Sequence, residues 1–182
     1  QPITTGLDWS AWQGFSGAVE MCNNNGACRK ASGGVMCPSF RATRDENDVT
    51  RGRANTLRLA LSGQLDDDGL LSETLADTLA LCVGCKGCKR ECPTGVDMAR
   101  MKTEVLYQRN LRHGIGNRDR LIAYLPRYAA TASRFGGILN LRDKIPGLAK
   151  LSEAALGLSA KRSLPTWHPR PYTDPTGAIG KG

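Results

Sequence analysis

The chain has 182 residues, a formal net charge of +8 at pH 7 and 40% hydrophobic residues, so it is long enough for one domain with a buried core. A charged fraction of 23% excludes a disordered polyelectrolyte, and an aromatic fraction of 5% argues against a stacking platform for single-stranded nucleic acid. No apolar run approaches the roughly 18 residues that cross a bilayer, and the sequence has no signal peptide.

Helical periodicity recurs along the chain, and the first helix is predicted over residues 11–21. A second helix is predicted from about Asp48 to Ser62, because its apolar residues share one face and Gly63 is a stop signal. Ser72 is expected to cap the next helix. That helix carries Leu75, Leu79 and Cys82.

Later in the chain, Thr94 and Asp97 have the spacing of a capping box for a helix that reaches about Asn110. We interpret the apolar stripe of this helix as core packing; it consists of Met98, Met101 and Val105.

Two further helices are predicted towards the C-terminus. Asn117 is expected to cap the first, which Pro126 should kink and Gly136-Gly137 should end. Pro146 opens a short helix that stops near Gly157. Four prolines after Ser163 impose an extended tail.

No stretch alternates as a strand does, so the predicted fold is all-α. The two ends of the chain indicate a piece of something longer. The chain starts at Gln1 without a methionine and stops in a glycine-rich run with no closing element. We expect a segment of a larger protein; a trimmed small protein is the alternative.

Four of the seven cysteines lie within eleven residues and are followed by Pro93: Cys82, Cys85, Cys88 and Cys92. Their odd total and tight spacing argue against a disulfide framework. The run CVGCKGCKRECP has the spacing of bacterial ferredoxins, in which three thiolates hold one cubane and the fourth serves another cluster. Structural zinc is the alternative, but it usually takes its ligands in two separated pairs.

A degenerate second copy of this motif lies upstream. Cys22, Asn25 and Cys28 repeat the same spacing, with asparagine in place of the middle cysteine. Both copies place two basic residues after the third position and end in Cys-Pro, although the first copy carries five extra residues before Cys37-Pro38.

When each motif gives its Cys-Pro cysteine to the cluster of the other motif, every cysteine is assigned to a cluster. Cluster A, a 4Fe-4S cluster, takes Cys37, Cys82, Cys85 and Cys88. Cluster B takes Cys22, Cys28 and Cys92. Cluster B is then 3Fe-4S, or 4Fe-4S with one iron bound by Asn25, by another side chain or by water. In the alternative, Asn25 only forms a turn and cluster B is absent.

The surroundings suit this chemistry, because glycines let backbone N–H groups approach cluster sulfurs and cations offset the charge of the clusters. These glycines are Gly26, Gly33, Gly34, Gly84 and Gly87. The cations are Arg29, Lys30, Lys86, Lys89 and Arg90.

Two Cys-Pro-ended motifs joined by helices resemble the helical ferredoxin module. More narrowly, CNNNGACRK, GGVMCPSFRATRDE, TRGRANTLRLALSG and CKGCKRECPTGVDMARMK resemble the iron–sulfur segment of large bacterial FAD-linked oxidoreductases. That family is D-lactate or D-2-hydroxyglutarate dehydrogenase-like. The resemblance covers roughly residues 10–165.

The resemblance implies an electron-transfer module that relays electrons from reduced flavin to an external acceptor. It implies FAD on a preceding domain of the same parent chain and a further domain after Gly182. We expect a cytoplasmic protein, with any membrane association made through partners. We expect an iron–sulfur module over 1–113, a helical extension packed on it over 114–162, and a linker over 163–182. Asn25 departs from the two-cluster pattern.

Other functions stay open at this point. A cluster with an open iron could act as the Lewis acid of a hydro-lyase, but such a site needs a base. The only histidines, His113 and His168, adjoin neither motif, and surface or packing roles are simpler for both. No catalytic residue is therefore assigned to this chain.

The basic residues raise two more alternatives. Nucleic-acid binding would use Arg41, Arg44, Arg51, Arg53 and Arg58, but a solvated or docking surface is simpler, and we expect no nucleic-acid partner. An anionic membrane or an acidic partner would meet Arg109, Arg112, Arg118, Arg120 and Arg127. We expect docking onto neighbouring domains instead, and no binding to liposomes at physiological salt.

Overall fold

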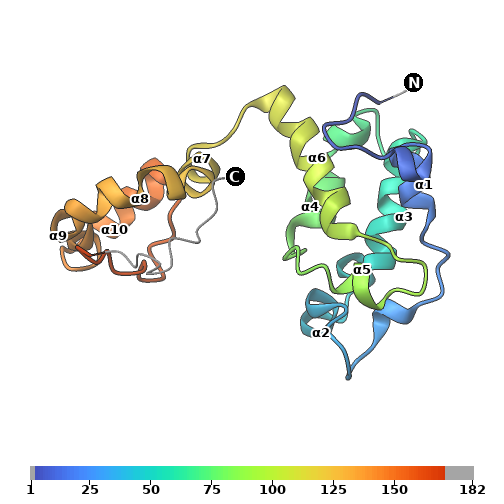
Figure 1. The fold of residues 1–182 in the computed structure, drawn as a ribbon, viewed down its shortest axis with the longest axis horizontal. Helices are drawn as coiled ribbons and strands as arrows, with labels where there is room; N and C mark the ends of the chain where they lie inside the picture. Colours follow the sequence, from blue (N-terminus) through green and yellow to red (C-terminus); the bar gives the residue numbers. More distant parts are fainter. Residues whose placement is uncertain (1–2, 171–182) are drawn as a thin grey trace, which may run out of the picture. The chain divides into compact units, whose positions relative to one another are not determined.

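The computed structural model describes residues 3–170, and every regular element in that range is a helix (Figure 1). The predicted all-α fold is confirmed. The chain forms two compact units, residues 1–114 and residues 115–182. In the described part of the chain, no helix is both long enough and apolar enough to cross a membrane.

The first unit is built from two halves that each contain one cysteine motif. The first half comprises η1 (Ser10–Trp12), α1 (Phe15–Glu20), η2 (Ala27–Arg29), α2 (Pro38–Thr43), η3 (Glu46–Asp48) and α3 (Thr50–Leu61). The second half comprises η4 (Gly69–Leu71), α4 (Glu73–Ala80), α5 (Gly87–Glu91) and α6 (Met98–His113).

Helix α3 is the centre of this unit, because α1, α4 and α6 all pack against it. Its predicted apolar face is confirmed: Ala54, Leu57 and Ala60 are buried, and Leu61 is partly buried against the same core. Complete burial of one leucine side chain contributes about 1.5–3 kcal/mol, so burial of this face stabilises the packing of α3. The predicted α6 stripe faces the same core, with Met98, Met101 and Val105 buried.

A buried carboxylate fixes the start of the chain to α6. Glu104 is 0% exposed and accepts hydrogen bonds from Gly6 N at 2.9 Å, Leu7 N at 3.0 Å and Trp9 Nε1 at 3.0 Å. Gln108 Nε2 adds a fourth at 3.0 Å. Although burial raises the pKa of Glu104, these donors outweigh it and hold that pKa below its ordinary value.

Three predictions about helices in this unit are wrong. The helix predicted to carry Cys82 ends at Ala80, so Cys82 lies in the loop that follows α4. The helix predicted over 11–21 is interrupted, because Gln13 and Gly14 adopt φ of 58° and 119° and separate η1 from α1. The capping box does not form. Asp97 itself caps α6, and its Oδ1 accepts from Arg100 N at 3.1 Å. The predicted Ser72 cap is confirmed, since Ser72 Oγ accepts from Leu75 N at 3.3 Å.

The second unit contains α7 (Asn117–Ala123), α8 (Leu125–Arg134), α9 (Gly136–Leu139), η5 (Asn140–Asp143) and α10 (Leu148–Leu156). Pro126 lies in the first turn of α8, so the predicted kink is a break at Tyr124. Gly136 opens α9 instead of ending a helix, and Asn117 makes no side-chain cap. Gly157, with φ of 68°, ends α10 as predicted.

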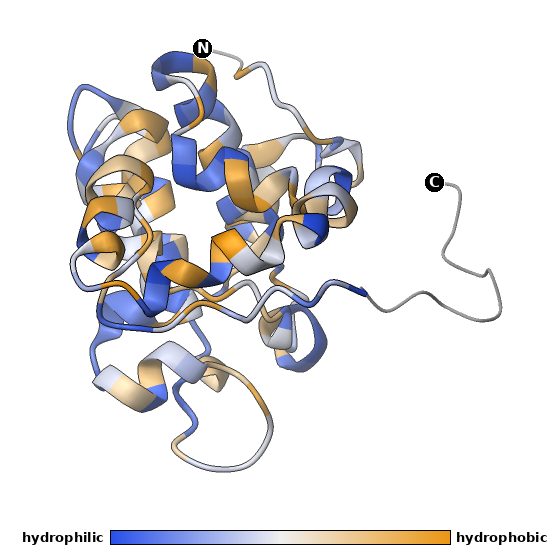
Figure 2. Ribbon diagram, turned by 90° about the vertical axis from the view of Figure 1, so that its left-hand side faces the viewer, coloured by the Kyte–Doolittle hydropathy of each residue, from blue (hydrophilic) through white to orange (hydrophobic). Residues whose placement is uncertain are grey.

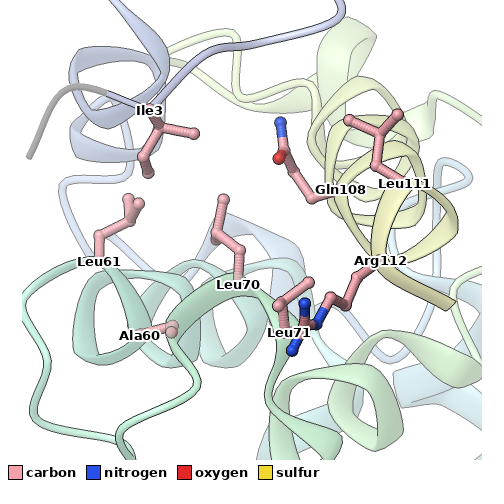
Figure 3. Close-up of a pocket in the computed structure, with 9 residues that line it drawn as sticks. Ile3, Ala60, Leu61, Leu70, Leu71, Gln108, Leu111 and Arg112 are labelled. Atoms are coloured by element: carbon pink, nitrogen blue, oxygen red, sulfur yellow. The ribbon is translucent and has the colours of Figure 1, made fainter.

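The hydropathy view shows apolar and polar residues side by side on most helices (Figure 2). On the first unit, a groove lies between the end of α3, η4 and α6, and no cysteine lines it (Figure 3). After α10, residues 163–170 form no regular helix. The rest of the predicted linker, residues 171–182, lies outside the described residues.

Candidate metal centre

Four cysteines from both halves of the first unit line one cavity. Cys82 and Cys85 lie in the loop between α4 and α5, Cys88 lies in α5, and Cys37 immediately precedes α2. These are the four cysteines predicted for cluster A. All seven cysteines are free thiols in the structure. Cys37 and Cys88 are buried, whereas Cys85 is exposed, so one corner of this centre faces solvent.

Cys37 is surrounded by hydrogen-bond donors. Ser39 Oγ lies 3.4 Å from Cys37 Sγ and also 2.7 Å from the Asp48 carbonyl oxygen, so its single proton can serve either acceptor. Arg53 Nη1 lies 3.6 Å from the same sulfur. Burial raises the pKa of Cys37, but Ser39, the Phe40 N–H and Arg53 together hold that pKa below its ordinary value.

The thiol of Cys88, a residue of α5, lies beside the N-terminus of α6. The backbone N–H groups of Met98 and Ala99 interact with its thiol, and a helix N-terminus favours negative charge. Burial nevertheless raises the pKa of Cys88. Lys86 and Lys89 reach the same region, each with Nζ 3.7 Å from Asp97 Oδ2.

The predicted cluster B cysteines have similar surroundings. Cys22 and Cys28 are buried and close enough to interact, and the backbone N–H of Arg51 at the start of α3 interacts with Cys28. Burial raises the pKa of Cys28. The short η2 helix that carries Cys28 packs against α5, the helix that leads to Cys92.

Cys92 repeats the environment of Cys37. Thr94 Oγ1 lies 3.2 Å from Cys92 Sγ, and the backbone N–H groups of Thr94, Gly95 and Val96 also interact with this sulfur. Burial raises the pKa of Cys92, but these donors outweigh it and hold that pKa below its ordinary value.

Asn25 is exposed and its side chain is engaged in a local turn. Its Oδ1 accepts from Ala27 N at 2.8 Å, and its Nδ2 donates to Asn23 Oδ1 at 2.5 Å. An Asx turn of this kind uses the oxygen that a metal would need. One of the two lone pairs of the Asn25 oxygen is therefore engaged in the turn.

The loop that contains the five extra residues of the first motif lies against the second motif. We call this loop, residues 31–36, the strap. Glu91 in α5 accepts from Val35 N at 2.6 Å and from Met36 N at 3.0 Å, and Arg41 donates to the Gly33 carbonyl oxygen. The strap places Met36 in the wall of the cavity beside Cys37.

The donor set fits an iron–sulfur cluster. Within residues 3–170, no three Cys, His, Asp or Glu side chains lie close enough together to hold a single metal ion. A cubane takes one thiolate at each corner, so its ligands lie further apart than those of one tetrahedral ion. Four thiols around a cavity, with a guanidinium and a helix N-terminus beside them, suit an anionic cluster.

Comparison with known proteins gives a match for the part of the chain that carries both cysteine motifs. Residues 18–96 match the family model of the 4Fe-4S dicluster domain.

Curated relatives match the chain beyond residues 18–96. The chain is 31% identical over 158 residues to a D-2-hydroxyglutarate dehydrogenase of Pseudomonas putida, covering 65% of this chain and 16% of that protein. The enzyme of the same name from Escherichia coli is 26% identical over 181 residues, covering 80% and 18%. A probable glycolate oxidase iron-sulfur subunit of Bacillus subtilis is 28% identical over 85 residues, covering 45% and 18%.

These relatives confirm the resemblance to the iron–sulfur segments of such oxidoreductases. The chain spans 16–18% of the length of each. No solved structure matches the chain.

Sequence reasoning missed several residues that surround the cysteines. Ser39 and Thr94 could have been found, because the internal repeat extends to Cys-Pro-Ser and Cys-Pro-Thr. Arg53 was assigned to a basic surface group, but it is 0% exposed and contacts Cys37. Two other arginines of that group are also occupied: Arg51 pairs with Glu46 at 2.6 Å, and Arg58 donates to the Cys22 carbonyl oxygen.

The two histidines belong to different units. His113 is the last residue of α6 and is exposed, and His168 is an exposed residue of the second unit. His113 does not line the cavity that the four cysteines share, so it is not placed there as the base that the hydro-lyase alternative requires.

Proposed function

We propose that this chain is the electron-transfer segment of an FAD-linked 2-hydroxy acid dehydrogenase. The FAD-binding domain of the parent protein would oxidise a substrate of the D-2-hydroxyglutarate or D-lactate type. This segment would relay electrons from the reduced flavin to an external acceptor. The observation that carries the proposal is that Cys37 lines the same cavity as Cys82, Cys85 and Cys88. The family match and the printed names of the relatives support it.

The four cluster A cysteines would hold a 4Fe-4S cluster, which supplies one-electron redox chemistry when bound. The thiols fix its position. Arg53 and the N–H groups of Met98 and Ala99 offset negative charge on the sulfurs. Met36 contributes an apolar wall that limits water on one side, while the exposed Cys85 leaves a route to the surface.

The three cluster B cysteines would hold either a 3Fe-4S cluster or a 4Fe-4S cluster with one iron not bound by thiolate. The local turn favours a centre with three protein ligands, because both polar groups of the Asn25 side chain are turned to neighbouring residues of the same loop. Thr94 and the backbone N–H groups after Cys92 would stabilise the thiolate that completes this set.

The first experiment is quantification of iron and sulfide, with EPR spectroscopy, on anaerobically purified protein. We expect about 7–8 irons per chain and signals from two clusters that dithionite reduces reversibly. A value of about four irons per chain would mean that cluster B is absent and that Asn25 marks a site that has been lost. Zinc without iron, or clusters that cannot be reduced, would refute the electron-transfer proposal.

A further inference from the structure

Arg53 is an arginine without exposure to solvent, placed beside a cluster ligand. Its Nη1 lies 3.6 Å from Cys37 Sγ, its Nη2 lies 3.0 Å from Ser39 Oγ, and its Nε donates to the Thr78 carbonyl oxygen at 2.9 Å. All three guanidinium nitrogens therefore have partners inside the protein.

The carboxylate available to Arg53 balances its charge only in part. Asp48 Oδ1 lies 3.5 Å from Nη2, and the Asp48 side chain keeps some contact with solvent. The other two partners are a hydroxyl and a carbonyl, which carry no net charge. Burial of a cation is costly unless negative charge lies close by, so the thiolate form of Cys37 is the natural second counter-charge.

We propose that Arg53 is a positioning residue that raises the reduction potential of the cluster held by Cys37, Cys82, Cys85 and Cys88. This inference rests on the proposed function. Reduction adds one electron from the donor to this centre and moves no proton to Arg53, which stays charged throughout. The added negative charge is stabilised by a fixed positive charge at low dielectric, and by the hydrogen bond to the Cys37 sulfur.

Two other charged side chains lie near Arg53, and a test must separate their effects on the potential from that of Arg53. Asp48 opposes its effect from η3. Lys102, on α6, interacts electrostatically with Arg53 and donates from Nζ to the Cys82 carbonyl oxygen at 2.7 Å. Removal of Arg53 and neutralisation of Asp48 must therefore shift the potential in opposite directions.

The test is an EPR-monitored redox titration of the full chain with its clusters, using dithionite as reductant. The cluster A signal is identified as the one lost in Cys85→Ser. We expect Arg53→Met to lower the reduction potential of this cluster by at least about 59 mV. For one electron, this shift is a tenfold change in the equilibrium constant of reduction. Asp48→Asn should raise it, and Arg53→Lys should fall between wild type and Arg53→Met. Arg112→Met removes the same charge from an exposed position on α6 and should leave it unchanged.

The proposal is overturned when Arg53→Met keeps its cluster at the wild-type potential, or when Arg53→Met and Asp48→Asn shift it in the same direction. When Arg53→Met fails to assemble the cluster, Asp48→Asn and Arg53→Lys decide, and no rise in Asp48→Asn overturns the proposal. A wild-type chain without reducible clusters refutes the electron-transfer function, and this inference with it. A wild-type chain that titrates normally beside unaffected variants refutes the role of Arg53 alone.

Discussion

Glu104→Gln is the sharpest test of how the first unit is held together. The carboxylate receives four hydrogen bonds, from Gly6, Leu7, Trp9 and Gln108, and each of its two oxygens accepts two of them. Glutamine keeps one oxygen and turns an NH2 group towards the other two donors. Hydrogen bonds to a charged acceptor contribute about 1.5–3 kcal/mol each, so losing two costs about 3 kcal/mol after partial relaxation.

For a unit of this size we expect the apparent Tm to fall by about 10 °C. The assay is anaerobic thermal unfolding at one fixed scan rate, followed by circular dichroism. The matched control is Glu73→Gln, which removes a carboxylate whose side chain is 79% exposed and pairs with Arg109 at 2.6 Å. Exposed ion pairs contribute less than about 1 kcal/mol, so this variant should stay close to wild type.

The pH dependence of stability gives a second test of Glu104. The pKa of Glu104 is lower in the folded chain than in the unfolded chain, so its contribution is present above the unfolded pKa and is lost as pH falls through the folded pKa. The gap in apparent Tm between wild type and Glu104→Gln should therefore be full at pH 7 and shrink below the ordinary pKa of glutamate. A gap below 2 °C at pH 7, or one that widens in acid, would refute the reasoning.

Three further changes test the metal centre. Cys85→Ser should remove one cluster and lower the iron content to about 3–4 per chain, while the EPR signal of the other cluster persists. Asn25→Cys supplies a fourth thiolate and should raise the iron content to about eight, with any 3Fe-4S signal lost; an unchanged spectrum would contradict the alignment of the two motifs. Glu91→Gln weakens the bonds to Val35 and Met36, so a chelator should remove iron faster than from wild type. Equal rates would mean that the strap does not protect the cluster.

Periodicity was a good guide wherever packing decided the structure. The apolar stripes of α3 and α6 were predicted correctly because a core-facing helix must repeat its apolar residues every three or four positions. Cysteine spacing paired Cys37 with the second motif, and Cys37 lines the same cavity as three cysteines of that motif. In both cases the signal is a spacing that the chain itself carries.

Two errors had different causes, a competition between two helix caps and an arginine that is buried. Thr94 and Asp97 are both good helix caps, and the contact between Thr94 and Cys92 leaves Asp97 as the cap. Arg53 was misplaced because a charged residue on a helix is normally exposed. Its partners inside the protein, among them Asp48 and Cys37, sixteen residues away in the sequence, are brought to it only by the fold.

The bonds from Glu91 to the strap have a consequence for synthesis of the chain. Met36 and Glu91 are 55 residues apart, so the strap makes its bonds to the second motif only after Glu91 has left the ribosome. Its bond from Arg41, within the first half, can form earlier. The cavity that Cys37 shares with the second motif is therefore completed late, after both motifs have been translated.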